Sequence, residues 1–148
     1  RRCLVGSEMC IRDSYNTDYK LDNEQLYCNW LVKVALSEGY SLNNIVYAFF
    51  NDTDVKSLNI KFLNHNYFTD VLSFDDSDGY HLKGNIAVSV DRVRENSKKY
   101  STKFDDELRR VMVHGLLHFM GYNDSSDEEI KVIRAKEEKM LRLFHVKQ

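Results

Sequence analysis

The chain has 148 residues, of which 43% are apolar and 30% are charged, a size and mixture typical of one globular domain. Its formal net charge of -2 gives no overall attraction to polyanions, so any binding of nucleic acid must depend on a local basic surface. No apolar run approaches the roughly 20 residues that cross a bilayer, and no secretion leader is recognisable, so we expect a cytoplasmic protein.

The N-terminal stretch differs in character from the rest of the chain. Residues 3–14, CLVGSEMCIRDS, resemble the in-frame translation of a sequencing adapter. We therefore predict that residues 1–14 are not native, leave them out of the fold prediction, and assign residues 15–148 to a single domain. The three cysteines lack the spacing of a zinc-binding motif, and their odd number argues against a framework of disulfides.

The first half of this domain predicts a helix, a strand and a second helix. Apolar residues recur at helical spacing over residues 21–38, which indicates an amphipathic helix. Residues 44–50, NIVYAFF, have the β-branched and aromatic content of a buried strand. The polar residues NDTD then offer N-cap side chains for a helix that runs from residue 51 to about residue 64.

The second half predicts two strands followed by three helices. The strands are VLSF at residues 71–74 and IAVSV at residues 86–90, separated by an acidic loop that contains glycine. The helices follow at residues 91–100, 105–120 and 126–144. A few strands covered by several helices pack naturally as an α+β fold, which is the fold class we predict.

One segment of the fourth predicted helix and the loop after it has the pattern of a metal site. His114 and His118 are four residues apart, which places both imidazoles on one face of the helix. Gly121 stands where a helix commonly ends in the left-handed conformation, and Asp124 can then turn back toward the histidines. Two nitrogens and a carboxylate are typical ligands of zinc. The sequence therefore predicts one zinc ion per chain, held by His114, His118 and Asp124.

The predicted ligand set is that of a catalytic rather than a structural zinc. Structural sites have four protein ligands, and nothing adjacent in the sequence supplies a fourth, although Cys28 or His145 could do so through folding. An open position would hold water, whose pKa the zinc would lower toward neutrality, and the ion would stabilise charge on a carbonyl or phosphoryl oxygen.

Zinc peptidases use the same histidine spacing, so a peptidase is the first alternative. Those enzymes carry a glutamate directly after the first histidine as general base, and this position is Gly115 here. A peptidase would need another acid, such as Glu107, to take over that role.

Two blocks of the sequence make a resemblance to a known family specific. The segment HGLLHFMGYND resembles the metal-binding motif of the YbeY family of endoribonucleases. Upstream, residues 58–59 (LN), 69–74 (TDVLSF) and 84–86 (GNI) resemble further elements of that family at similar separations. The resemblance spans roughly residues 15–144 and implies a small mixed β-sheet, with the metal site on a central helix and the loop that follows it.

The chain departs from the family pattern at three positions. The usual Tyr-Asp-His becomes YND, so that the third ligand is Asp124 instead of histidine. Leu63 stands where the family commonly has an arginine, and Asn85 replaces an aspartate. Of the nearby candidates Lys61 and His65, we select His65 as the residue that replaces the arginine at the phosphate and so as the predicted catalytic residue.

The resemblance also implies the biological role. It predicts a zinc-dependent endoribonuclease in ribosomal RNA maturation and ribosome assembly, with ribosomal RNA and small-subunit particles as partners and with no membrane or DNA partner. A non-catalytic assembly factor with a structural metal is a further alternative, which the missing arginine favours. Basic residues of the last predicted helix could touch RNA, but the interleaved Glu137 and Glu138 predict an ordinary exposed face.

Overall fold

The structure is a computed structural model that describes residues 8–11 and 19–145. Within these residues it contains four strands and five helices. In chain order they are β1 (Glu8–Ile11), α1 (Glu24–Ser37), β2 (Ser41–Phe50), α2 (Asp52–Leu63), β3 (Val71–Asp75), β4 (His81–Ser89), α3 (Val90–Lys99), α4 (Phe104–Phe119) and α5 (Asp127–Phe144).

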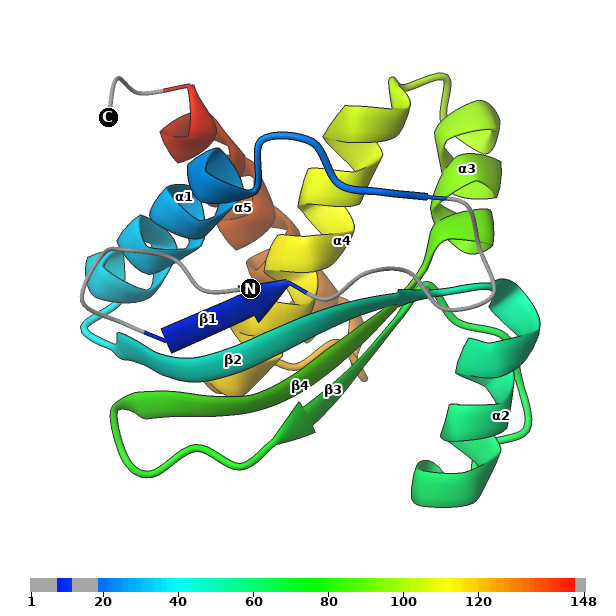
Figure 1. The fold of residues 1–148 in the computed structure, drawn as a ribbon, viewed down its shortest axis with the longest axis horizontal. Coiled ribbons are helices and arrows are strands. Elements are labelled where there is room, and N and C mark those ends of the chain that lie inside the picture. The colour runs from blue at the N-terminus through cyan, green and yellow to red at the C-terminus, as the bar shows by residue number, and fades with distance from the viewer. Residues whose placement is uncertain (1–7, 12–18, 146–148) are drawn as a thin grey trace.

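The strands form one mixed sheet in the order β1-β2-β4-β3. β2 is parallel to both β1 and β4, whereas β3 and β4 pair as an antiparallel hairpin. Figure 1 shows α1, α3, α4 and α5 above the sheet and α2 below it, at the end where β2 and β4 finish. The predicted α+β fold with a small mixed sheet is confirmed.

The main core lies between the sheet and the helices above it. Trp30 of α1 is fully buried, and its indole nitrogen donates to the carbonyl of Met140 in α5 over 2.8 Å. Tyr47 of β2 is also buried, and its hydroxyl donates to the carbonyl of Met112 in α4 over 2.9 Å. These two bonds satisfy the polar ends of large aromatic side chains, and they join α5 to α1 and α4 to the sheet.

Helix α4 comes unusually close to the sheet at Gly115. A Cβ atom at this position would lie 3.0 Å from a methyl group of Ile86 and 3.1 Å from one of Val71. The hydroxyl of Ser73 donates to the Gly115 carbonyl over 2.9 Å. Glycine therefore lets the helix that carries both histidines lie directly on β3 and β4.

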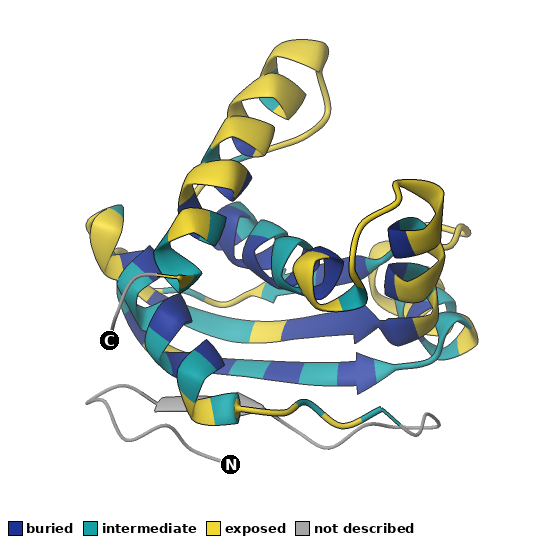
Figure 2. Cartoon of the chain, turned by 90° about the horizontal axis from the view of Figure 1, so that it is seen from above, coloured by how far each residue is buried: buried dark blue, intermediate teal, exposed yellow. Residues whose placement is uncertain are grey.

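Helix α5 has two different halves. Its first turns project away from the body and are mostly exposed (Figure 2), while its second half packs on α1 and α4. A capping box begins this helix, because Ser126 and Glu129 bond each other's backbone nitrogens. No helix in the described part of the chain is long and apolar enough to span a membrane.

Most predicted elements match within a few residues, but β4 was predicted too short and too far along. It begins at His81, five residues before the predicted start, because its polar first half pairs with the beginning of β2. Its last predicted residue, Val90, instead begins α3, which Ser89 caps. Strand β1 was not predicted, since it lies inside the excluded residues 1–14, and the rest of that stretch is outside the described residues.

Candidate metal centre

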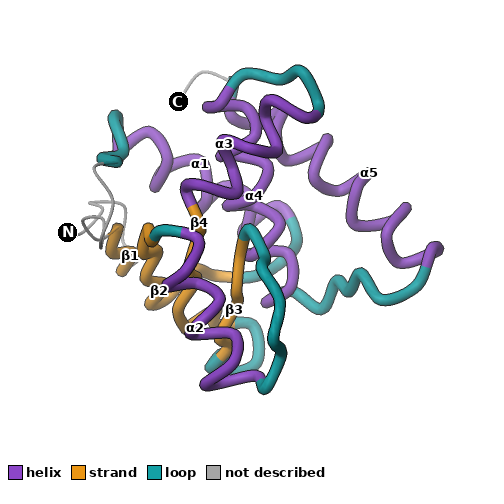
Figure 3. Tube along the Cα trace, turned by 90° about the vertical axis from the view of Figure 1, so that its right-hand side faces the viewer, coloured by secondary structure: helices purple, strands orange, loops and turns teal. Residues whose placement is uncertain are grey.

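A cleft of about 430 Å³ lies between the loop that follows α2 and the loop that follows α4. Figure 3 shows both loops in teal, on the side of the molecule that faces the viewer. The floor is formed by the start of β3 and by the last turns of α4. The predicted ligands His114, His118 and Asp124 all line this cleft, as does the predicted catalytic residue His65.

Three ligand atoms of the predicted metal site converge in the cleft. The Nε2 atoms of His114 and His118 are 3.0 Å apart. The Asp124 Oδ2 atom is 3.2 Å from the first and 3.6 Å from the second. Ligand atoms around a tetrahedral zinc, each at about 2.0 Å from it, are roughly 3.3 Å from one another, so the three atoms have the spacing that zinc requires.

The hydrogen-bond partner of Nδ1 in each imidazole determines which ring nitrogen carries the proton. The Nδ1 atom of His118 faces the Tyr122 carbonyl oxygen at 2.9 Å, and a carbonyl only accepts hydrogen bonds. The Nδ1 atom of His114 faces a carboxylate oxygen of Glu137 at 2.5 Å. Each Nδ1 therefore donates, so that the Nε2 atom of each imidazole faces the cleft. Two lone pairs and a carboxylate that face one another are an arrangement that a cation stabilises.

The charge states of these groups agree with that arrangement. Burial lowers the pKa of His118, and the nearby His114 lowers it further, which favours the neutral ring. Burial alone would raise the pKa of Glu137, but the hydrogen bond with His114 and the charge of Arg110 outweigh burial and hold the pKa below its ordinary value. Glu137 is therefore an ionised acceptor behind His114.

In the part of the chain that the structure describes, no fourth metal-binding side chain joins this group. Neither Cys28 nor His145, the fourth ligands considered from the sequence, belongs to it. Asp124 is 45% exposed, whereas the side chain of His114 is only 13% exposed. The open direction of the site is thus on the side of Asp124, toward the cleft and solvent.

Glu137 is the site residue that the sequence analysis missed. We expected it on an exposed face, which is wrong, because it is only 2% exposed. It lies on the buried stripe of α5 together with Ile133 and Met140, at the spacing of one helix face. A carboxylate on an apolar stripe was the signal that could have identified it, since such a group is rarely buried without a partner.

The loop that carries Asp124 is anchored by Tyr122. Gly121 has φ +90°, a left-handed conformation that turns the chain after α4. The Tyr122 hydroxyl then donates to the carboxylate of Glu38 at the end of α1, which also pairs with Lys136 of α5 at 2.9 Å. The Tyr122 carbonyl also accepts from His118 of α4. Through this bond and its bond to Glu38, Tyr122 connects the candidate ligand His118 with α1, α4 and α5.

His65 lies on the opposite wall of the cleft and is exposed. Its ring stacks on Tyr67 with centroids 5.3 Å apart, and its Nδ1 atom is 3.1 Å from the Tyr67 hydroxyl. Asn59, which is fully buried, donates from its amide to the Tyr67 carbonyl over 3.1 Å. Leu63 also lines this wall, so the position of the missing arginine does face the cleft.

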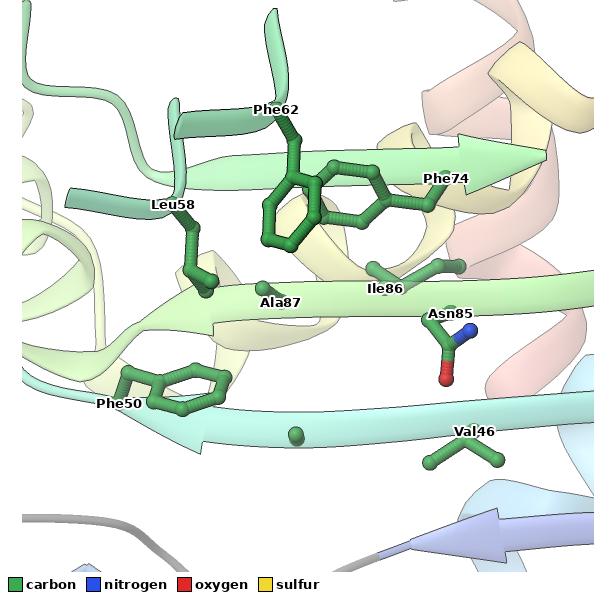
Figure 4. Close-up of a pocket in the computed structure, with 9 residues that line it drawn as sticks. Val46, Phe50, Leu58, Phe62, Phe74, Asn85, Ile86 and Ala87 are labelled. Carbon is green, nitrogen blue, oxygen red and sulfur yellow. The ribbon is translucent and has the colours of Figure 1, made fainter. Parts of the chain in front are cut away.

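A second pocket, of about 520 Å³, lies on the other face of the sheet under α2. Figure 4 shows Phe50, Phe62 and Phe74 around it, with the amide of Asn85 as a polar group among apolar side chains. Although this pocket is larger than the cleft, none of its lining residues is titratable. Acid-base or metal chemistry therefore belongs to the cleft that contains the histidines.

Comparisons with known proteins agree on one family. The sequence pattern of the family described as "Endoribonuclease YbeY" matches residues 11–145. Proteins named Endoribonuclease YbeY include one from Flavobacterium johnsoniae, 41% identical over 93% of this chain and 99% of its own length. Another, from Flavobacterium psychrophilum, is 44% identical over 91% of this chain and 96% of its own length. A solution structure of a Thermotoga maritima protein, 25% identical, superposes with a TM-score of 0.61 over 92% of this chain and 88% of that protein.

Proposed function

The chain belongs to the YbeY family of endoribonucleases, and from this premise we propose that it is a zinc-dependent endoribonuclease acting in ribosomal RNA maturation. The observation that carries the proposal is the convergence of two imidazole lone pairs and one carboxylate at the floor of an open cleft. His114, His118 and Asp124 would hold the ion. Zinc bound there would supply Lewis acidity for the attack of water on a phosphodiester.

The remaining residues of the cleft would bind and orient the RNA. His65 lies on the wall opposite the ligands, and its Nδ1 atom is engaged by Tyr67. Its Nε2 atom is then the one that can donate to a phosphate oxygen. Because Leu63 cannot offer a charge where relatives commonly have arginine, we propose that His65 makes the phosphate contact and that cleavage is slow.

The biological setting is proposed from the family alone. Ribosomal RNA and small-subunit particles would be the partners, and the cytoplasm would be the location. Because the net charge of -2 gives no overall attraction to RNA, RNA binding would depend on local contacts in the cleft.

The two alternatives are less well supported. A peptidase would need a general base, but position 115 is glycine, and Glu107 is buried against Arg110 and is not among the residues that line the cleft. A structural metal would need a fourth protein ligand, and the described residues bring only three together. An open coordination position favours catalysis over a purely structural role.

RNA cleavage by the purified zinc form tests the proposal. Wild type should cleave RNA, leave unstructured peptides intact, and bind RNA more weakly as salt rises, since phosphate contacts release counterions. A His114→Ala variant prepared in parallel controls for contaminating ribonucleases, and His65→Ala should slow cleavage further. Equal RNA cleavage by wild type and the His114→Ala variant would leave only the assembly-factor alternative. Peptide hydrolysis lost in that variant would indicate a protease.

A further inference from the structure

A buried cluster of charged side chains lies directly behind the candidate metal site. Arg110 of α4 bonds Glu107 in its own helix at 2.6 and 3.0 Å. The same guanidinium reaches Glu137 in α5 and Asp70 before β3, each at 3.4 Å. Glu107 and Glu137 are 4% and 2% exposed, whereas the side chains of Arg110 and Asp70 are 19% and 24% exposed, so the two glutamates form the buried part of a cluster that links three parts of the fold.

Stability alone is a poor explanation for this cluster. Removing several charges from water costs free energy that their mutual attraction often fails to recover, and well-packed apolar residues of similar volume are commonly as stable. A buried network of this kind is better explained if it orients a neighbouring side chain. The only candidate metal ligand that it touches is His114.

The two oxygens of Glu137 face in opposite directions. One, Oε1, accepts from Arg110 at 3.4 Å and from Arg134 at 3.1 Å. The other, Oε2, accepts from His114 Nδ1 at 2.5 Å. The two arginines thus fix the Glu137 carboxylate, and the carboxylate in turn fixes the His114 ring. The side chain of Arg134 is 54% exposed, so the network reaches the surface there.

We propose that Glu137 is the positioning residue of the metal site, which keeps the proton of His114 on Nδ1 so that Nε2 faces the metal. The proposal rests on the proposed function, because it assumes that the three converging atoms bind a cation. Arg110 fixes Glu137, and through Asp70 it also fixes the start of β3, which forms the floor of the cleft. Carboxylates behind metal-bound histidines act in this way, and their loss typically weakens metal binding by roughly 10- to 100-fold.

The test compares Glu137→Leu and Glu137→Gln with a matched control, Glu138→Gln. Leucine removes the acceptor, glutamine keeps its shape without the charge, and Glu138 is the exposed neighbour on the same helix. Two readouts are independent of RNA cleavage: the zinc dissociation constant from competition with a chelator, and the proton position on His114 from nitrogen chemical shifts of the zinc-free protein.

We expect Glu137→Leu to weaken zinc binding roughly 10- to 100-fold and to move the His114 proton partly to Nε2. Glu138→Gln should match wild type in both readouts. A folded Glu137→Leu variant with wild-type zinc affinity and an unchanged proton position would overturn the positioning role. Should Glu137→Leu fail to fold, Glu137→Ala, which also lacks the acceptor, decides the matter by the same two measurements; Glu137→Gln, whose amide oxygen can still accept from Nδ1, should lie between them and wild type. If wild type itself binds no zinc, the proposed function fails rather than the role of Glu137 alone.

Discussion

The candidate metal centre has two sides that are built differently. On the helix side, His114 is backed by Glu137, a carboxylate that is 2% exposed and tied to Arg110. On the loop side, His118 is backed only by the Tyr122 carbonyl, and Asp124 is 45% exposed. The same group of three candidate ligands thus combines a buried, charged half with a solvent-facing half.

This difference suggests that the two sides of the candidate metal centre have different roles. The helix side would be held in place before an ion binds, because moving Glu137 would leave charges buried without partners. The loop side is where an ion and a substrate can enter, and a ligand there can change with less disturbance of the core. The position of Asp124 on this side, where the family resemblance implies a histidine, is consistent with that view.

Removing an imidazole from the centre should have the largest effect. We expect His118→Ala to reduce bound zinc from about one ion per chain to almost none, because two remaining ligands hold zinc far more weakly than three. Elemental analysis of protein purified with zinc measures this directly. Zinc retained at full stoichiometry would remove the site, whichever side is the more rigid.

The helix side should be sensitive to loss of its cation. Arg110→Met leaves Glu107 and Glu137 buried with less compensation, so the free energy of unfolding of the zinc-free protein should fall by roughly 3 kcal/mol. Denaturant unfolding provides the measurement. Arg94→Met is the matched control, since its ion pair with Asp91 is long, at 3.8 Å, and half exposed. Equal losses of unfolding free energy from the two substitutions would mean that the buried cluster stabilises the fold no more than an exposed ion pair does.

The loop side should tolerate a change of ligand. We expect Asp124→His to keep zinc bound, with an affinity within roughly 10-fold of wild type, because imidazole is also a zinc ligand. Chelator competition tests this, and Asp124→Ala shows the effect of losing the ligand altogether. A histidine variant that binds no better than the alanine variant would show that Asp124 is not a ligand, or that only a carboxylate fits there.

The anchor of the loop side should respond to pH. The pKa of Glu38 is lowered, since its bonds to Tyr122 and Lys136 outweigh the effect of burial. A lowered pKa in the folded state means that Glu38 stabilises the fold above its ordinary value of 4.5 and loses this contribution as the pH falls through the lower, folded value. Glu38→Gln should therefore cost about 1 kcal/mol at pH 7 and less at pH 3. Thermal melts at both values test this, and a cost that does not shrink in acid would contradict it.

Deleting residues 1–14 should affect the metal centre least. None of the candidate ligands comes from this stretch, and its only described element is β1, at the edge of the sheet. We expect unchanged zinc content and a melting temperature lower by a few degrees at most. A large loss of stability would mean that these residues contribute to the core, against the prediction that they are not native.

The candidate ligands were more predictable from the sequence than the charged cluster behind His114. His114, His118, Gly121 and Asp124 lie within eleven residues, so helix geometry and one glycine turn suffice to bring them together. His65 was also predicted to lie near the site, and it does line the cleft, although its role there remains a prediction.

The charged cluster behind His114 was not predicted, because it depends on packing between segments far apart in the chain. Glu137 reaches His114 only when α5 lies on α4, and Arg110 reaches Asp70 only when α4 lies on β3. Charge patterning alone placed Glu137 on a solvated face. The stripe that it shares with Ile133 and Met140 was the better guide, since helical spacing reports burial more directly than residue type does.

The close approach of α4 to the sheet at Gly115 also limits which other activities this fold could acquire by mutation. Introducing a glutamate after the first histidine would be the simplest way to convert a nuclease of this design into a peptidase. Here the new side chain would start 3.0 Å from Ile86 and 3.1 Å from Val71, pointing into the sheet instead of the cleft. The helix would have to lift, and both histidines would move with it. A laboratory or natural change of chemistry in this protein would therefore need to recruit its base from the loops around the cleft.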